Sequence, residues 1–343
     1  MGTADRRRVA AAEPGAEAGT LEVAAERASV KMGVAMRPVF ADPKTDFVFK
    51  RIFGAEVHKR LLIELLNALL ELDDEHRIVD LKYLTPEQHV PVDELKLSLV
   101  DVKCFDQSGR HYVVEMQVLN VEGFEKRVVY NTSKAYVTQL RTGEDYPQLD
   151  DVVGVTICDF LLWPESPQEG GPSVPMLSRW RMQEQHGGAQ GLSQVQYVFL
   201  ELPKYRAGDD PQGLIDRWAY FFREAENLDV VPPALAELPF REALEVARIA
   251  NFTAGELEIY DQAKIAEQDA RGALSFAERH GREAGRAEGH EEGLAEGLRR
   301  AVRGLCRAFD IELDDERESA LTAMGVPELE ALQDRLLRDR SWS

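Results

Sequence analysis

The sequence has few cysteines and no long apolar stretch. Its 343 residues include three cysteines, Cys104, Cys158 and Cys306, and none of them belongs to a CxxC motif. This odd number and wide spacing argue against a disulfide framework and against a zinc site, so we expect reduced thiols in a cytoplasmic protein. No apolar stretch is long enough to cross a bilayer, so we predict no membrane span. The amino-terminal region also lacks the apolar segment of a secretory signal.

Several catalytic motifs and a surplus of positive charge are also missing. There is no GxxxxGK[ST] loop, no HExxH and no GxSxG, and the seven histidines show no zinc-finger spacing. The 61 acidic residues outnumber the 41 Lys and Arg, which leaves a net charge of −20. Such a charge opposes the long-range attraction of nucleic acid. It does not exclude a locally basic surface, and acids that hold a metal ion also count toward it.

The composition changes along the chain and predicts more than one unit. Residues 1–40 are rich in Ala, Gly and Glu, so we predict a disordered tail. Residues 41–208 mix helical and strand patterns, residues 209–280 are helical, and residues 302–343 read as a helical hairpin. Between them, residues 281–301 carry glycine at every fourth position, and each glycine costs about 1 kcal/mol inside a helix. The repeat predicts either a helix that closely approaches another helix or a flexible charged linker.

The patterns within residues 41–208 predict a mixed sheet with helices packed against it. Residues 46–54, 56–72 and 124–143 have apolar side chains at helical spacing. Five segments have the character of strands: 77–84, 94–105, 110–118, 152–163 and 194–205.

Two neighbouring predicted strands each carry an acidic residue. If the turn between them is a three-residue loop with Gly109 in the left-handed conformation, Asp101 lies directly opposite Glu115. Gln117 shares their face of the sheet, and Met116 points to the other face. Two like charges at this distance repel each other, and Mg²⁺, which binds one or two carboxylates together with water, would remove the repulsion. The alternative is an ordinary solvated sheet face.

These strands carry a resemblance to a known nuclease superfamily. The stretch VDVKCFDQSGRHYVVEMQV is similar to the core of the PD-(D/E)XK nucleases. More narrowly, DPKTDFVFKRIFG, VEMQV and KRVVYNTSKAYVTQLRTGEDYPQLDDVVGVTICDF resemble the Rpn family of recombination-promoting nucleases, also described as transposase-like proteins, over about residues 42–290. The resemblance implies an α/β fold with a restriction-endonuclease-like mixed sheet flanked by helices, followed by an all-helical C-terminal region.

The same resemblance implies roles for individual residues. Asp101 matches the first metal acid of the superfamily, Glu115 matches the acid of the second element, and Gln117 stands where the lysine usually is. The implied cofactor is Mg²⁺, or Mn²⁺ in its place, held by Asp101, Glu115 and the carbonyl of Met116. A neutral Gln can orient water by hydrogen bonds, but it supplies no positive charge.

Two further acids and one basic stripe complete the candidate site. Asp46 and Glu64 are candidate accessory acids, with a helix cap and a helix-face charge as the respective structural alternatives. Four polar residues at helical spacing predict contacts to DNA phosphates, the alternative being an ordinary solvated face: Arg127, Asn131, Lys134 and Arg141.

Together these observations predict a Mg²⁺-dependent DNA endonuclease associated with recombination or transposition, with a helical C-terminal region that promotes self-association. The alternative from another class is a catalytically weak or inactive nuclease-fold scaffold that acts through this C-terminal region. Gln117, the acidic total and the long helical tail favour the alternative. RNA in place of DNA as the substrate also stays open.

Overall fold

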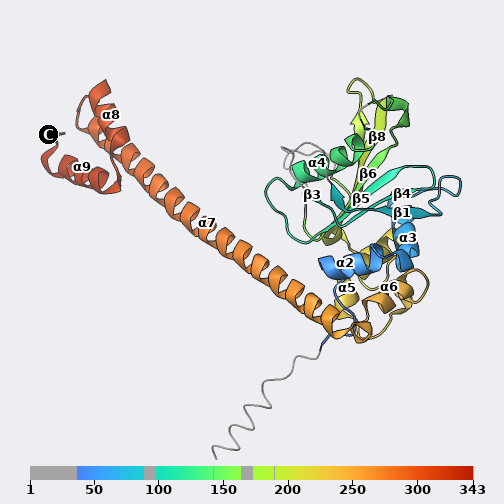
Figure 1. Cartoon of the computed structure of the whole chain (residues 1–343). Helices are drawn as coiled ribbons and strands as arrows, with labels where there is room; N and C mark the ends of the chain where they lie inside the picture. Colours follow the sequence, from blue (N-terminus) through green and yellow to red (C-terminus); the bar gives the residue numbers. More distant parts are fainter. Residues whose placement is uncertain (1–36, 89–97, 142, 164–172, 189, 343) are drawn as a thin grey trace, which may run out of the picture. The chain divides into compact units, whose positions relative to one another are not determined.

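The computed structural model describes residues 37–88, 98–141, 143–163, 173–188 and 190–342 (Figure 1). The chain divides into two compact units, Met1–Ala263 and Lys264–Ser343, and each is considered by itself. Among the described helices, none is both long enough and apolar enough to cross a membrane.

The first unit is built on a six-stranded mixed sheet with the order β1-β4-β5-β6-β8-β7. Strands β5, β6 and β8 run parallel, whereas β1, β4 and β7 pair antiparallel with their neighbours. The strands are β1 (Leu81–Leu84), β4 (Val102–Asp106), β5 (His111–Gln117), β6 (Val152–Cys158), β7 (Leu177–Gln183) and β8 (Gly191–Glu201). Two short strands, β2 (Glu87–Gln88) and β3 (Ser98–Leu99), form a separate pair.

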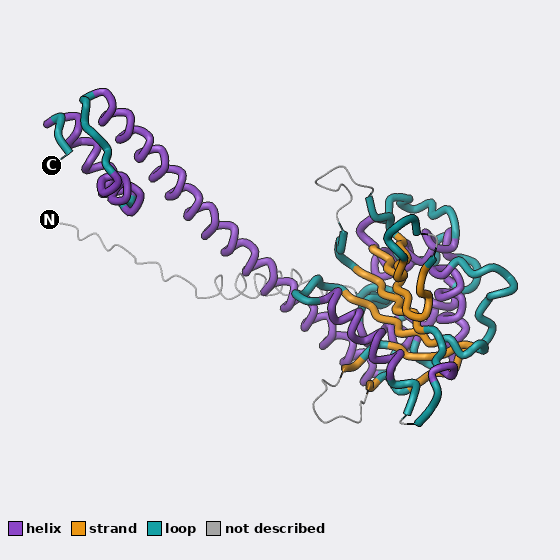
Figure 2. Tube along the Cα trace, turned by 90° about the horizontal axis from the view of Figure 1, so that it is seen from above, coloured by secondary structure: helices purple, strands orange, loops and turns teal. Residues whose placement is uncertain are grey.

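Helices cover both faces of this sheet, as the views in Figures 1 and 2 show. Helix α4 (Phe124–Val137) connects the parallel strands β5 and β6 and packs on one face. The helices that belong to the main core of the unit are α2 (Asp46–Phe53), α3 (Lys59–Leu70), α5 (Leu214–Glu224) and α6 (Phe240–Ala247). All seven residues of β6 are buried, and all but Thr156 are Val, Gly, Ile or Cys, as is typical of a parallel strand covered on both faces. Short 3₁₀ helices lie between these elements: η1 (Glu56–His58), η2 (Tyr146–Gln148), η3 (Leu202–Lys204), η4 (Ala225–Asn227), η5 (Pro233–Leu235) and η6 (Ile249–Asn251).

The predicted fold class is confirmed, and so is the register of the acid-bearing hairpin. Val102 pairs with Val114 and Phe105 with His111, the register that the three-residue loop requires. Gly109 has φ 93°, in the left-handed region as expected. Strand β7 was not predicted, because its residues from Arg179 to Gln183 are all exposed, so buried and exposed positions do not alternate along it.

The structure draws the limits of the first unit more widely than the predicted segment 41–208. Trp218 and Phe222 of α5 pack on Phe53 of α2 with ring centroids 5.8 and 5.7 Å apart, so the predicted helical region 209–280 shares this core as far as Ala263. Of the predicted tail, residues 1–36 lie outside the described residues. Phe40 is fully buried, and the carbonyl of Val39 accepts a hydrogen bond from the amide of Ile249.

The second unit contains most of one long helix and two short ones. Helix α7 (Ala254–Ala308) continues through the whole glycine repeat, so residues 281–301 are helical. At each of Gly281, Gly285, Gly289, Gly293 and Gly297, an added Cβ would meet open space, so no described helix approaches there. Helices α8 (Asp315–Ala323) and α9 (Val326–Asp339) pack on the end of α7 around one small core: Val302, Cys306, Leu321, Leu329, Leu332 and Leu336.

Asp106 holds the hairpin between β4 and β5 closed. Its Oδ1 accepts hydrogen bonds from the amides of Ser108 and Arg110 and from the Ser108 hydroxyl. Its Oδ2 accepts a hydrogen bond of 2.7 Å from the hydroxyl of Tyr112, and the residue is 6% exposed. One buried carboxylate therefore accepts four hydrogen bonds that close the turn, and the bond from the Tyr112 hydroxyl is itself buried.

We expect Asp106→Ala to lower the free energy of unfolding by about 3 kcal/mol, because the buried Tyr112 hydroxyl and the donors of the turn lose a charged acceptor. Urea denaturation followed by circular dichroism measures the change. Asp145→Ala removes an exposed carboxylate and should shift the value by less than about 0.5 kcal/mol. Equal effects of the two substitutions would contradict this role of Asp106.

Candidate active site

Asp101 lies one residue before β4, where the ladder between β4 and β5 ends. Its Oδ2 accepts a hydrogen bond of 2.7 Å from the backbone amide of Met116. The side chain thus takes the place of a main-chain acceptor on β4. The Asp101 carboxylate is thereby held against β5, the strand that carries Glu115, and its side chain is only 19% exposed.

Glu115 lies in the middle of β5 and faces helix α4. It is 8% exposed, and its Oε1 accepts a hydrogen bond of 2.8 Å from the side-chain amide of Asn131. Asn131 is 1% exposed, and its own Oδ1 is buried without a hydrogen-bond partner among the described residues. Glu115 therefore lies among polar groups under α4, and one of these groups, the Asn131 Oδ1, accepts no hydrogen bond from the described residues.

The pKa values of both carboxyl groups are raised, although a positively charged side chain lies near each. Burial, with a contribution from the negative charges of Asp46 and Glu115, raises the pKa of Asp101 to about 7, against the lowering effects of the Met116 amide and Lys50. Burial also raises the pKa of Glu115, against the hydrogen bond from Asn131 and the charge of Arg127. A cation bound between the two acids would stabilise their ionised forms.

Lys50 and Asp46 reach this site from helix α2. The Nζ of Lys50 lies 2.6 Å from Oδ1 of Asp46 and 3.7 Å from Oδ1 of Asp101. The structure therefore brings Asp46 beside the acid pair. Glu64, the other candidate accessory acid, is engaged elsewhere: it accepts a hydrogen bond of 2.6 Å from Arg77 and lines a separate cavity of about 650 Å³.

Gln117 follows Glu115 on the same face of β5, and both ends of its side-chain amide are engaged. Its Nε2 donates to the carbonyl of Leu119 at 2.8 Å, and its Oε1 accepts from the guanidinium of Arg127 at 2.5 Å. The role of Gln117 in orienting water stays a prediction. In the structure, its hydrogen bond with Arg127 links the end of β5 to α4.

The donor set fits a hard divalent cation. Among the described residues, no group of three or more His, Cys, Asp or Glu side chains is placed to hold a metal ion. Mg²⁺, however, is commonly bound through one or two carboxylates with water completing the shell. The amide of Met116 points to Asp101, and the carbonyl of a strand residue points to the same side as its amide. Asp101, Glu115 and the Met116 carbonyl are thus the residues that would hold it.

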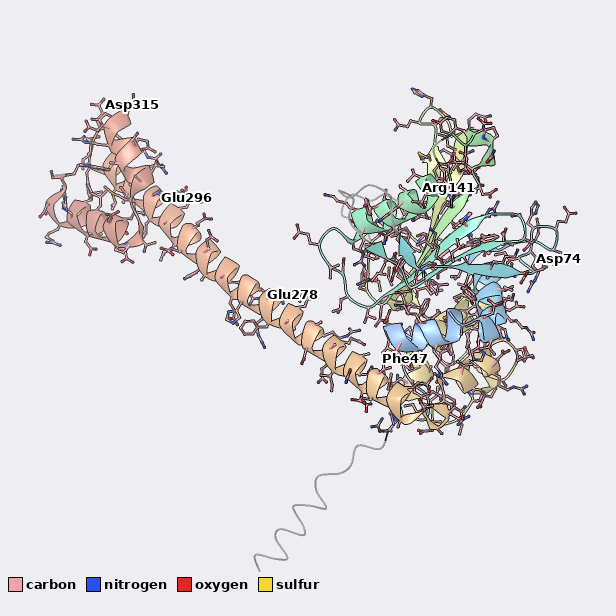
Figure 3. All side chains as sticks on the ribbon, viewed as in Figure 1. Phe47, Asp74, Arg141, Glu278, Glu296 and Asp315 are labelled. Atoms are coloured by element: carbon pink, nitrogen blue, oxygen red, sulfur yellow. The ribbon has the colours of Figure 1, made fainter. Side chains whose placement is uncertain are left out.

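The predicted basic stripe is not a single exposed face. Arg127 and Arg141 are exposed, and Arg141 lies beyond the end of α4, as Figure 3 shows. Asn131 and Lys134 are instead buried, at 1% and 4% exposure. The reason is that Asn131 lies three residues after the buried Val128, on the face of the helix that packs against the sheet.

Two positions of the site were not predicted from the sequence. Lys50 was missed, although its spacing of four residues from Asp46 in a helix indicates that the two side chains meet. The support of Glu115 by Asn131 was also missed, and the signal for it was the spacing of Asn131 from the apolar residues Phe124, Val128 and Ala135.

The chain matches a known protein family. The family model of a PD-(D/E)XK nuclease family transposase matches residues 43–277. The matched region includes the whole sheet, both acids of the pair and the helices of the main core. No curated protein and no solved structure matches the chain.

Without divalent ions, ionisation of Asp101 should oppose folding. Folding raises its pKa, so the penalty is absent below about pH 4, where Asp is protonated in both states. The penalty grows as the pH rises and levels off above about 7. In EDTA, we expect the parent to lose on the order of 3 kcal/mol more of its unfolding free energy between pH 4 and 8 than Asp101→Asn does.

Urea denaturation of the parent and of Asp101→Asn at both pH values measures this difference. Asn keeps an acceptor for the Met116 amide, so the variant changes charge and leaves the hydrogen bond in place. The same pH dependence of the unfolding free energy in both proteins would show that folding does not raise the pKa of Asp101.

Proposed function

The chain belongs to the PD-(D/E)XK nuclease family transposases, and from this premise we propose that it is a Mg²⁺-dependent DNA endonuclease. The observation that carries the proposal is the acid pair of half-buried Asp101 and buried Glu115, at the end of a strand ladder where the Met116 amide donates to the Asp101 side chain. Membership of this family supports a nuclease or transposition-related role, and the donor set supports the ion.

The proposed reaction is hydrolysis of a phosphodiester. The oxygen of a water forms a bond to phosphorus, the bond between phosphorus and one sugar oxygen breaks, and a water proton ends on that leaving oxygen. When bound, the metal ion supplies charge neutralisation at the phosphate and a water of lowered pKa. Asp101 and Glu115 fix the position of that ion, and Asn131 holds the Glu115 carboxylate in place.

The proposed DNA contacts are revised by the structure. Arg127 and Arg141 remain candidates because both are exposed and can reach a phosphate. Asn131 and Lys134 are buried, so we propose that they contact other residues of the protein and not DNA. Burial lowers the pKa of Lys134. An interface with so few exposed cations predicts weak binding to non-specific DNA with only a shallow salt dependence, because few counterions are released.

A scaffold function is the second candidate. It is favoured by Gln117, whose amide is engaged at both ends by Leu119 and Arg127 and which supplies no charge. A scaffold would retain the fold and lose the metal-dependent chemistry. Binding of Mn²⁺, measured by isothermal titration, separates the two: no heat at low millimolar Mn²⁺ would support the scaffold.

Nicking of supercoiled plasmid tests the enzyme directly. We expect cleavage with Mg²⁺ and none with EDTA, and Asp101→Ala or Glu115→Ala should lower the rate by about 10²-fold or more, because each removes a ligand that fixes the ion. Glu125→Ala, which removes an exposed acid at the start of α4, should cut like the parent. Cleavage by Asp101→Ala at the parental rate would overturn the site, and preferential cutting of single-stranded RNA would change the substrate.

Self-association through the C-terminal helical region is the second part of the proposal. Residues 268–294 of α7 are exposed throughout, and Glu278, labelled in Figure 3, lies within this stretch. A lone helix that carries several glycines is marginal in water. Six alanines and His280 are spaced alternately by four and three residues, the spacing of the residues that face the partner helix in a coiled coil. The alanines are Ala266, Ala270, Ala273, Ala277, Ala284 and Ala287, and His280 takes the position between Ala277 and Ala284.

We expect the parent to be a dimer or larger and the double variant Ala273→Glu/Ala277→Glu to be a monomer, because charged groups would face each other across the seam. Light scattering coupled to size exclusion gives the mass of each. Ser275→Glu places the same side chain outside the seam and should leave the mass unchanged. A monomeric parent at tens of micromolar would refute the association.

A further inference from the structure

The acid pair has a positively charged neighbour that does not come from its own two strands. In this site Gln117 stands where a cation would be expected, and its amide is bound to Leu119 and Arg127. The charge of a phosphate under attack still requires compensation beyond that of the ion. The question is which side chain of this chain can supply it.

We propose that Lys50 is a catalytic residue of the endonuclease, and that its ammonium compensates the charge of the scissile phosphate in place of the cation absent at Gln117. The proposal rests on the proposed function. Its basis is geometric: the Nζ of Lys50 lies 3.7 Å from Oδ1 of Asp101, the acid whose other oxygen is held by the Met116 amide.

Helix α2 fixes Lys50 at this place. Val48, Phe49, Ile52 and Phe53 are all fully buried, so the face of α2 that enters the core is set by four apolar side chains. Lys50 therefore lies on the outer face of the helix, and it is 43% exposed. A side chain anchored at its backbone and open at its tip can meet a ligand that arrives from solvent.

The ammonium also has donors to spare. Lysine carries three N–H donors, and one is directed to Asp46 at 2.6 Å. The longer distance to Asp101 is an ion pair without a short hydrogen bond. Two donors thus remain for a phosphate oxygen or for the attacking water beside Asp101. Asp46, on this view, orients the ammonium and is not a metal ligand.

Two other cations near the acids are less suited to the role. Arg127 is bound to Gln117 and lies over the ring of Phe124 at 5.4 Å, so its guanidinium is already engaged. Lys103 lies on β4 two residues after Asp101, but its side chain is partly buried, and burial together with the charge of Lys134 lowers its pKa. Lys50 combines exposure with a position at the acid pair.

The competing explanation is a surface ion pair without function. Exposed pairs contribute about 0 to 1 kcal/mol, and removing one leaves catalysis unchanged. Lys59 offers a matched control, because it bridges two acids in the same manner, with Nζ 2.9 Å from both Glu56 and Asp80. It belongs to α3 and has no part in the proposed site.

The experiment compares Lys50→Met, Lys50→Arg and Lys59→Met with the full-length parent. We expect kcat for plasmid nicking to fall about 10² to 10³-fold in Lys50→Met, with KM changed by less than about threefold. Lys50→Arg should recover part of kcat because it keeps the charge. Lys59→Met should cut like the parent.

Binding of Mn²⁺ to the free protein, measured by isothermal titration, supplies a readout that does not depend on cleavage. Removing the ammonium beside Asp101 removes a charge that competes with the ion, so Lys50→Met should bind Mn²⁺ about fivefold more tightly than the parent, while Lys59→Met should not. A urea midpoint within error of the parent confirms that the variant is folded.

The outcomes separate the two claims. A parent that does not cut with Mg²⁺ overturns the proposed function, and the catalytic role of Lys50 with it. A parent that cuts, together with Lys50→Met that cuts at the same rate, overturns only the role of Lys50. Loss of Mn²⁺ binding in Lys50→Met would also overturn it, because Lys50 would then support the shape of the site.

Discussion

The hydrogen bond from the Met116 amide to the Asp101 carboxylate is the interaction on which the site depends. It forms where the β4–β5 ladder stops, so the Asp101 side chain accepts the hydrogen bond that a main-chain carbonyl would accept within the ladder. This bond fixes an acid beside Glu115 in a place that water reaches poorly, and burial then raises the pKa of both groups. A site so constrained is stable as a pair of anions only when a cation is near, and Lys50 and a divalent ion are the two candidates.

Those parts of the site that depend on local geometry could be predicted from the sequence. The turn at Gly109 sets the hairpin register, and the period of two in a strand then decides which side chains share a face with Asp101 and Glu115. Both rules act over a few residues and involve no distant partner. The family resemblance, resting on the same residues, agrees with the match over residues 43–277.

The parts that depend on tertiary packing could not be predicted in this way. Lys50 meets Asp101 across a separation of fifty-one positions only because the apolar face of α2 enters the core next to α5 and α6. Asn131 points inward because the sheet face beneath it is itself polar at Glu115, which inverts the usual expectation that polar helix residues face water.

The net charge of −20 and a DNA substrate are compatible once distance is considered. Salt screens interactions between exposed charges beyond about 8 to 10 Å, so the total charge of the chain does not fix the potential at the site itself. Within that range the relevant positive charges are Lys50, Arg127 and the proposed ion, set against the carboxylates of Asp101, Glu115 and Asp46. The acidic total then acts mainly on encounter, by slowing approach to a polyanion and weakening non-specific binding. An endonuclease of this kind would depend on a specific DNA structure, or on a partner chain, to be held long enough for cleavage.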